Sequence, residues 1–330
     1  MYFVLVDRFA NGDPSNDGAI DLTDPQAFHG GDLQGVLDHL DHLEAMGVRT
    51  VWLSPVFTMR TEKFMGHGAF HGYWVRDIGT VEPRFGDEAL LRKLSEELHA
   101  RGMHLVLDMV WNHVSFDSPL VEEQPDWFHP QRPIEDWDDP EQLVTREVHG
   151  LRDLAQENPE VHALLREQSL SWIDRVQPDG YRIDAVRHMP LAFQAAMGRD
   201  LRAHSSRPFY TLGEVFDGDP VRLSEAWEGG AFDSVFDFPL RYAMIDAFCR
   251  DRPVGRLGAV LSADRVYPDP NRVVTFLDNH DVSRVATECG GDLDKVGMAL
   301  DFLLAVRGIP CLTYGTEIGI TGAGEPENRA

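Results

Sequence analysis

An alternation of short apolar runs with longer amphipathic segments constrains the fold of this chain more than any other feature. The runs are rich in β-branched and aromatic residues, and eight of them recur along the chain, at 2–6, 50–54, 104–110, 180–186, 209–215, 234–238, 272–278 and 309–314. Segments with a helical period fill most of the intervals, namely Leu33–Met46, Asp87–Arg101, Pro159–Arg175, Pro190–His204 and Leu293–Val306. Strand-helix alternation is typical of a parallel sheet covered by helices. Eight such units close most simply into an α/β fold of the (β/α)8, or TIM, barrel type.

The length of the chain, 330 residues, suits one large barrel of this kind. An open doubly wound sheet is the alternative, but no GxGxxG motif follows the first run to support a dinucleotide site. One interval is unusual, because residues 114–158 are rich in Pro, Asp, Glu and Trp and lack a clear period. A long irregular stretch inside a compact domain usually serves a function. We therefore predict one barrel over 1–330, with a small inserted domain at 114–158 after the third strand.

Charge and cysteine content narrow the classes of partner. The chain has 55 acidic and 30 basic residues, a formal net charge of −25, which would repel nucleic-acid phosphates. No apolar run approaches the roughly 20 residues that span a bilayer, and the opening MYFVLVDRF shows no signal-peptide pattern. We therefore expect neither a nucleic-acid nor a membrane partner. The three cysteines, Cys249, Cys289 and Cys311, are odd in number and widely spaced, so we expect neither a metal-binding pair nor a disulfide framework.

Polar residues that end the apolar runs carry the chemistry. Asp108 ends the third run, Asp184 the fourth and Glu214 the fifth, and Asp281 follows the seventh. Any one of them could simply cap the next helix. In a barrel, however, the carboxyl ends of the strands meet on one face, and close carboxylates repel each other unless something offsets the repulsion. Two carboxylates that flank a bond are the minimum apparatus for glycoside hydrolysis, with one as nucleophile and one, with a raised pKa, as proton donor.

Four strings resemble, in order and spacing, the motifs of the α-amylase family of glycoside hydrolases: DMVWNH (108–113), GYRIDAVRH (180–188), GEVF (213–216) and FLDNHD (276–281). Further matches are DRFANGDPSND (7–17), FHGYWVRDIGTVEPRFG (70–86), LRDLAQENPEV (151–161) and YGTEIGITGAGEPENR (314–329). The resemblance extends from the first strand to the end of the chain. It implies a catalytic barrel with an inserted domain B, and it agrees with the carboxylate pattern.

The resemblance also implies roles for the strand-end residues. Asp184 would be the nucleophile that forms a β-glycosyl enzyme, Glu214 the general acid and base, and Asp281 the residue that stabilises the oxocarbenium-like transition state. Arg182 and Asp184 share one side-chain parity on their strand, so we expect the guanidinium to orient the carboxylate and to depress its pKa. For substrate binding the resemblance points to an aromatic platform, histidine donors, the arginine beside the nucleophile and residues beyond the scissile bond. These residues are Tyr73, Trp74, His113, Arg182, Arg187, His188 and His280.

Calcium is the cofactor that the resemblance implies, as one or two structural ions. The family binds one ion through positions that correspond to Asn112, Asp153 and the His188 carbonyl. A second ion would match a loop of cyclodextrin glucanotransferases, with ligands from Asn11, Asp13, Asn16, Asp17, the Gly30 carbonyl and Asp32. Oxygen ligands in a tight turn suit this hard cation. The same residues also build turns, and Asp32 could simply cap the following helix.

We expect retaining hydrolysis of α-1,4-glucosidic bonds in starch, maltodextrins or related α-glucans, with no obligate protein partner. A transglycosylase or cyclodextrin-forming glucanotransferase is the alternative, because both use the same triad. A non-catalytic binding protein is disfavoured, because the acid, the nucleophile and the arginine are all present. The resemblance implies an extracellular or periplasmic location. It also implies that the barrel is truncated at its C-terminus, without the family's eighth helix and β-sandwich, leaving outward side chains of the first and last strands uncovered.

Overall fold

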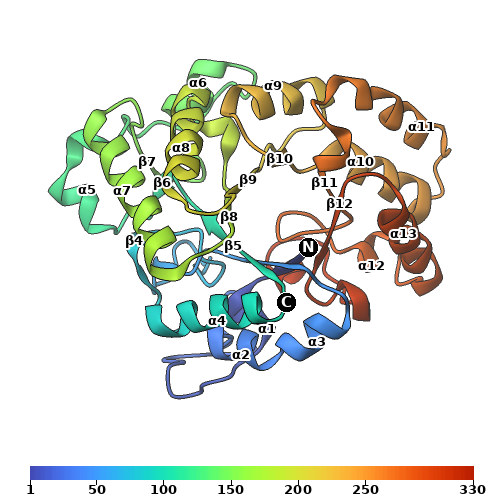
Figure 1. The fold of residues 1–330 in the computed structure, drawn as a ribbon, viewed down its shortest axis with the longest axis horizontal. Coiled ribbons are helices and arrows are strands. Elements are labelled where there is room, and N and C mark those ends of the chain that lie inside the picture. Colours follow the sequence, from blue (N-terminus) through green and yellow to red (C-terminus); the bar gives the residue numbers. More distant parts are fainter.

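The computed structural model describes all residues 1–330 and contains an eight-stranded parallel barrel (Figure 1). Its strands are β1 (Tyr2–Val4), β2 (Thr50–Leu53), β5 (His104–Met109), β8 (Gly180–Ile183), β9 (Tyr210–Gly213), β10 (Ser234–Val235), β11 (Val274–Phe276) and β12 (Ile309–Thr313). The pairing order is β10-β9-β8-β5-β2-β1-β12-β11, so each strand lies beside its predecessor in the barrel. A parallel bridge between Phe236 and Val274 connects the two ends of this order. The predicted (β/α)8 fold is confirmed.

Helices surround the barrel in Figure 1. Their bounds are α1 (Val6–Phe9), α2 (Leu33–Asp38), α3 (Leu40–Ala45), α4 (Glu88–Ala100), α5 (Pro119–Glu123), α6 (Pro140–Thr145), α7 (Pro159–Val176), α8 (Leu191–His204), α9 (Pro220–Gly230), α10 (Phe238–Met244), α11 (Gly255–Ser262), α12 (Val285–Glu288) and α13 (Leu293–Ala305). The helix predicted over 33–46 is divided, because the His39 backbone leaves the helical region and its Nδ1 lies 2.7 Å from the Gly35 carbonyl oxygen. After β12 the chain forms two 3-10 turns, Thr316–Ile318 and Glu327–Arg329.

Short polar side chains begin several of these helices. Asp87 accepts a hydrogen bond from the Leu90 amide at α4, and Asn158 accepts one from the Glu160 amide at α7, where Pro159 takes the first helical position. Such caps satisfy amides that have no partner inside the helix. They fix where each helix starts relative to the strand before it.

Aromatic side chains fill the barrel interior below the strand ends. The Phe3 and Trp52 ring centroids are 4.0 Å apart, those of Trp52 and Phe236 are 5.3 Å apart, and those of Phe236 and Phe276 are 5.7 Å apart. These side chains belong to a core cluster of 65 buried residues. Because protein interiors are close-packed, this layer gives the residues above it a rigid support.

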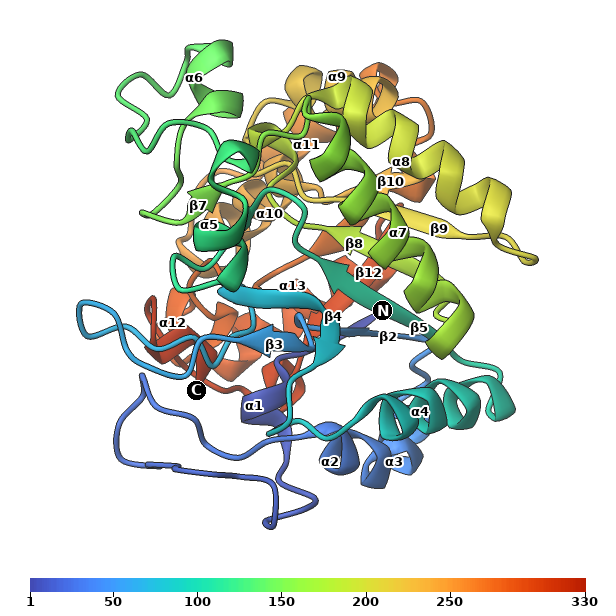
Figure 2. The ribbon, with the colours of Figure 1, turned by 90° about the vertical axis from the view of Figure 1, so that its left-hand side faces the viewer.

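Two excursions leave the barrel on the side that carries the strand ends. The first is a hairpin after β2, formed by β3 (Phe57–Met59) and β4 (Val75–Val81), which the sequence reading did not anticipate. The second covers the interval predicted as an inserted domain and contains α5, α6 and the antiparallel pair β6 (His113–Val114) and β7 (Arg152–Asp153). Figure 2 shows α5, α6 and β7 projecting to one side of the barrel.

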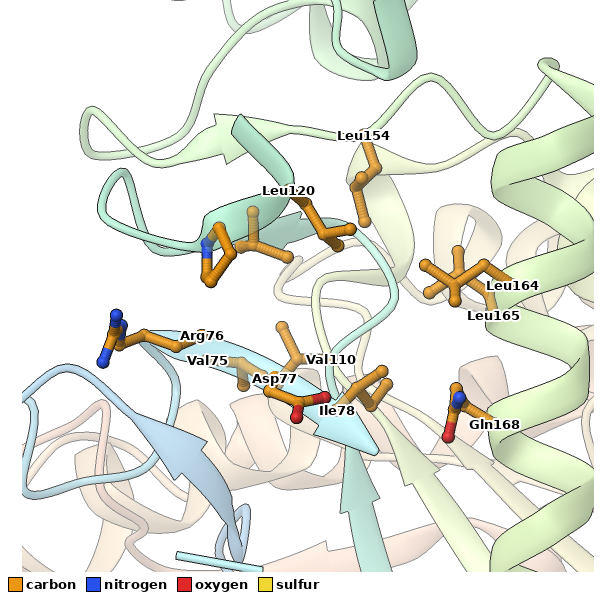
Figure 3. A pocket seen from close by; sticks show the side chains of 12 residues that line it. Val75, Arg76, Asp77, Ile78, Val110, Leu120, Leu154, Leu164, Leu165 and Gln168 are labelled. Atoms are coloured by element: carbon orange, nitrogen blue, oxygen red, sulfur yellow. The ribbon is translucent and has the colours of Figure 1, made fainter. Parts of the chain in front are cut away.

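A small apolar cavity of about 200 Å³ lies where the second excursion meets the barrel helices. Leu120 and Leu154 approach it from the excursion, Leu165 from α7, and Val75 and Ile78 from β4 (Figure 3). None of the predicted catalytic residues lines it. Its lining suits packing between the excursion and the barrel rather than chemistry.

The sequence predicted no disulfide framework, and the structure contains a single disulfide that its cysteine spacing did not indicate. Cys249 and Cys289 are bonded, across 40 positions of sequence, and Cys311 is free and buried. Cys249 ends a π-helical turn, Ile245–Cys249, that packs against α12 and α13, and Cys289 directly follows α12. Spacing along the chain gave no sign of this contact, because it depends on how the helices pack.

None of the helices combines the length and the apolar character needed to cross a membrane.

Candidate active site

The Arg182 side chain on β8 lies at the centre of the strand-end carboxylates. Its Nη1 atom is 2.9 Å from Asp108 Oδ1 and donates a hydrogen bond of 2.7 Å to Asp184 Oδ1, while Nη2 lies 2.8 Å from Glu214 Oε1. The side chain is fully buried. The register of the sheet explains this arrangement, because Asp108 on β5 is directly beside Arg182 and Glu214 directly follows β9, which pairs with β8 on its other side.

Glu214 and Asp184 both have raised pKa values. The pKa of Glu214 rises to about 8 and that of Asp184 to about 7, mainly because both groups are buried and despite the opposing charge of Arg182. Neighbouring carboxylates contribute to the rise: Asp184 and Asp281 for Glu214, and Asp108 and Asp281 for Asp184. The two groups therefore hold a proton more readily than an exposed carboxyl group does.

The expectation that Arg182 depresses the pKa of Asp184 needs correction. The guanidinium does favour the ionised form, but burial outweighs it and the net shift is upward. One positive charge is shared among Asp108, Asp184 and Glu214, so each carboxylate receives only part of its effect. Side-chain parity along one strand indicates the contact of Arg182 with Asp184. It does not show that carboxylates from neighbouring strands share the same guanidinium.

Asp108 is the penultimate residue of β5 and contacts several other residues of the site. Besides Arg182 it accepts hydrogen bonds from Trp52 Nε1 at 3.1 Å and from the Tyr73 hydroxyl at 2.9 Å. The sequence identified Asp108 as a strand-end carboxylate but assigned it no role. Its contacts place it as the residue that orients both Arg182 and Tyr73.

Asp281 follows β11 and completes the group of carboxylates. Its Oδ2 atom lies 3.2 Å from His280 Nε2, and its amide donates to Asn279 Oδ1 at 2.8 Å. Burial would raise the pKa of Asp281, but His280, Arg329 and Arg182 hold it below its ordinary value. Asp281 is thus the carboxylate of the site that stays ionised most readily.

Tyr73 and two histidines form the aromatic part of the site. The Tyr73 ring stacks on the His280 ring with centroids 4.8 Å apart and 9° between the planes. Burial lowers the pKa of His113 to about 4 and that of His280 to about 3, so both imidazoles are neutral at neutral pH. His113 Nε2 lies 3.2 Å from the Tyr73 carbonyl oxygen, and its Nδ1 lies 3.2 Å from Asn112 Nδ2. Both nitrogens of His113 therefore have protein partners, whereas His280 Nδ1 has none.

A cavity of about 810 Å³ opens above these groups. Asp184, Glu214 and Asp281 lie on its polar floor. Its rim carries large apolar side chains that are more than a third exposed, namely Phe64, Met65, Trp137 and Phe216. Every residue predicted to contact sugar except the buried Arg182 lines this cavity: Tyr73, Trp74, His113, Arg187, His188 and His280. Its size and its mixed lining fit a small-molecule site.

Several residues that line the cavity were missed from the sequence. His71 lies two residues before Tyr73, and its Nδ1 atom accepts a hydrogen bond of 3.0 Å from the Tyr73 amide. Trp137 packs edge-on against His188, with ring centroids 5.9 Å apart. Arg329 reaches the cavity from the 3-10 turn near the end of the chain. Arg329 belongs to one of the strings that resemble the family, but only the fold shows that this part of the chain returns to the strand ends.

The residues expected to hold the first calcium ion lie at the junction of the second excursion with the barrel. Asn112 precedes β6, which pairs with β7, and Asp153 ends β7. The buried oxygens Asn112 Oδ1 and Asp153 Oδ1 have no hydrogen-bond partner. Burial also raises the pKa of Asp153 to about 6. Unpartnered carboxylate and amide oxygens are the ligands that calcium prefers, so these residues fit the ion. No cluster of three or more His, Cys, Asp or Glu side chains is arranged around a metal position.

The expected second calcium loop is held together by its own hydrogen bonds. Asp32 caps α2 by accepting from the Gly35 amide at 2.6 Å, and it also accepts from the amides of Gly12 and Asp13. Asn11 Nδ2 donates to both oxygens of Asp17, at 2.8 and 2.9 Å. Asn16 Oδ1 is the buried oxygen of this loop that lacks a partner. Gly30 has a φ of 89°, in the left-handed region, and lies against Asn11 and Asp17. The capping interpretation of Asp32 describes what is observed.

The family model of the alpha amylase catalytic domain matches residues 3–330. The chain belongs to the α-amylase family. The chain is 33% identical in sequence to a cyclomaltodextrinase of Bacillus sp, over 99% of this chain and 60% of that protein. It is 31% identical to a cyclomaltodextrin glucanotransferase of Geobacillus stearothermophilus over all of its own length and 50% of that protein.

A crystal structure of an α-amylase from Geobacillus thermoleovorans, complexed with acarbose, superimposes on this chain with a TM-score of 0.91. The two are 37% identical in sequence, over 99% of this chain and 72% of that one. The chain spans between 28% and 66% of the length of the curated relatives it matches. The comparison therefore establishes the family and the barrel.

The pH dependence of catalysis tests the proton assignment. We predict a bell-shaped profile of kcat/KM whose alkaline limb lies near the raised pKa of Glu214, about 8, because the donor must still carry its proton. With an activated aryl glycoside that needs no protonation, Glu214→Gln should retain activity and lose this alkaline limb. The exposed Glu225→Gln on α9 is the matched control and should keep it. An alkaline limb that survives in Glu214→Gln would contradict the assignment.

Proposed function

We propose that this chain catalyses the retaining hydrolysis of α-1,4-glucosidic bonds in starch, maltodextrins or related α-glucans. The observation that carries the proposal is the contact of Asp184 and Glu214 with the two terminal nitrogens of one buried guanidinium. This contact holds both carboxyl groups at the floor of one cavity, next to each other. Retaining glycosidases need carboxyl groups about 5–5.5 Å apart, and residues that share one guanidinium suit a short separation better than the wider gap of inverting enzymes.

In the proposed mechanism Glu214 donates its proton to the glycosidic oxygen while Asp184 attacks the anomeric carbon. The bond to the leaving group breaks, and a β-glycosyl ester forms on Asp184. Glu214, now ionised, takes a proton from water, which attacks the same carbon and restores the α configuration. Asp281 stays ionised throughout and stabilises the positive charge that develops on the sugar ring in both transition states.

The sugar in the cleaved position would be held by the aromatic and histidine groups. Tyr73 offers a ring face at the cavity, fixed by stacking on His280 and by its bond to Asp108. His280 lines the cavity and would bind a hydroxyl group through Nε2, which lies 3.2 Å from Asp281 Oδ2, because its unpartnered Nδ1 is buried. His113 has no free nitrogen in this arrangement, so its proposed role as a donor requires it to exchange one of its protein partners for the sugar.

Transglycosylation is the second candidate, and the 31% identity to a cyclomaltodextrin glucanotransferase favours it. The chemistry differs only in the acceptor, since a sugar hydroxyl replaces water at the second step. The exposed Trp137 and Phe216 on the rim would favour transglycosylation by binding an acceptor sugar.

We also propose an extracellular or periplasmic location. The disulfide between Cys249 and Cys289 supports it, because disulfides persist in oxidising compartments.

The configuration of the first product tests the mechanism. We predict that maltooligosaccharide cleavage, followed by NMR before mutarotation, releases the α-anomer, because two inversions at one carbon restore its configuration. Chromatography of products from starch, pullulan and cyclodextrins then separates hydrolysis from cyclodextrin formation. A first product of β configuration would contradict the retaining mechanism.

We propose calcium as a structural ion at Asn112, Asp153 and the His188 carbonyl, supported by the two buried oxygens that lack partners. Chelation should lower Tm, since an ion that binds only the folded state stabilises it. Asn112→Ala should lower Tm in calcium and make it insensitive to EDTA. The exposed Asn271→Ala, on the surface far along the chain, should leave the calcium response intact. An unchanged Tm of the wild-type protein after chelation would contradict the proposal.

A further inference from the structure

Asp281 lies in a segment without regular secondary structure, between β11 and α12. A side chain that must act on a reacting sugar within a fraction of an ångström needs a fixed backbone. The Asp281 amide bonds to Asn279, inside the same segment, so this contact alone cannot fix the segment against the barrel. Arg241 of α10 holds the two ends of the segment by donating to the Leu277 and Ser283 carbonyl oxygens. Thr313 of β12 holds the Asp278 carbonyl oxygen. The backbone contacts directly on either side of Asp281 come from the chain beyond β12.

The Asn328 side chain contacts the backbone on both sides of Asp281. Its Nδ2 atom donates to the His280 carbonyl oxygen at 2.9 Å and to the Val282 carbonyl oxygen at 3.0 Å. Asn328 is 2% exposed, so these bonds are shielded from water. One amide group therefore joins the residue before Asp281 to the residue after it.

Arg329 adds a second contact to the same place. Its Nε atom donates to the His280 carbonyl oxygen at 2.9 Å, and its Nη2 atom lies 3.6 Å from Asp281 Oδ1. Glu325 holds the far side of the guanidinium, with Oε1 3.0 Å from Nη1. Arg329 thus acts on both the backbone next to Asp281 and its carboxylate.

The chain before these residues is held to the same segment. The Arg284 amide donates to the Gly322 carbonyl oxygen at 2.9 Å, and the Ser283 hydroxyl donates to the Ala323 carbonyl oxygen. A Cβ atom at Gly322 would lie 2.3 Å from the Glu327 carbonyl oxygen, so only glycine permits this close approach. Residues 322–329 therefore fold back on themselves and deliver Asn328 and Arg329 to the Asp281 segment.

We infer that Asn328 and Arg329 are positioning residues for Asp281, and that they act on the rate of glycoside cleavage through that carboxylate. The inference rests on the proposed function, because Asp281 matters to the rate only if it stabilises a developing positive charge. Neither residue needs to touch the substrate for this role. Asn328 sets the backbone geometry, and Arg329 sets both the geometry and the charge around the carboxylate.

The test is a double-mutant cycle on an aryl maltooligosaccharide with a good leaving group. Asn328→Ala should lower kcat by on the order of 10²-fold, the cost of a displacement of about 1 Å, and leave KM nearly unchanged, because the lost interaction belongs to the transition state. In an Asp281→Asn background the same substitution should cost little more, since residues that act as a unit are not additive. The exposed Glu327→Gln should match the wild type in every measurement.

The titration of Asp281 itself gives a second measurement that a merely structural role would not move. Arg329→Gln removes a positive charge that lowers the pKa of Asp281, so this pKa should rise. It can be followed by carbon-13 NMR of labelled aspartate carboxyl groups, with the Asp281 signal assigned from its loss in Asp281→Asn. In Asn328→Ala the Asp281 titration should stay close to that of the wild type. The titratable and charged groups that face Asp281 are otherwise unchanged: His280, Arg182, Asp184, Glu214 and Tyr73.

The outcomes separate the inference from the function on which it rests. Wild-type protein without activity on any α-glucan would overturn the proposed function and the inference with it. An active wild type with an unimpaired Asn328→Ala, or with equal losses in the two backgrounds, would overturn the positioning role alone. If Asn328→Ala does not fold, the carboxyl titration of Asp281 in Arg329→Gln decides, and an unchanged pKa of Asp281 would overturn the inference.

Discussion

The fully buried guanidinium of Arg182 is the charge on which the rest of the site depends. A buried cation is costly unless charged partners surround it with good geometry. Here Asp108, Asp184 and Glu214 all contact it, each from the end of a different strand. If any of these strands shifted its register, Arg182 would lose one of its charged partners. The barrel therefore brings the carboxylates together, and the arginine in turn makes their proximity tolerable.

Sharing one positive charge has a chemical consequence. A carboxylate with an arginine of its own would have a depressed pKa and could not hold a proton at neutral pH. Burial raises the pKa of Glu214 to about 8, since the charge of Arg182 is shared among several buried neighbours and does not offset it. Asp281, which has additional support from His280 and Arg329, stays below its ordinary pKa. A carboxyl group that can hold a proton and a carboxylate that stays charged can thus lie in one small space.

Much of the fold could be predicted from the sequence because its signals are local. The eight apolar runs and the amphipathic intervals each depend on neighbouring residues, and all eight runs correspond to barrel strands. Parity along one strand likewise placed Arg182 beside Asp184. The net pKa of Asp184 could not be predicted, since it depends on how many carboxylates converge from other strands.

The features that sequence reasoning missed are those made by distant segments. The bond between Cys249 and Cys289 depends on helix packing across 40 positions. The contact of Asn328 with the carbonyls of His280 and Val282 depends on the return of the chain after β12. The predicted catalytic and sugar-binding roles, the calcium ligands and the boundaries of the inserted domain remain predictions.

Trapping of the covalent intermediate tests the central claim most directly. A fluorinated maltosyl fluoride that glycosylates the enzyme quickly and is released slowly can be followed by mass spectrometry of proteolytic peptides. We predict one added fluorinated maltosyl group on the peptide that contains Asp184, and no addition in Asp184→Asn. A label on Glu214 or Asp281, or turnover of natural substrate with no trapped species and an inverted product, would contradict it.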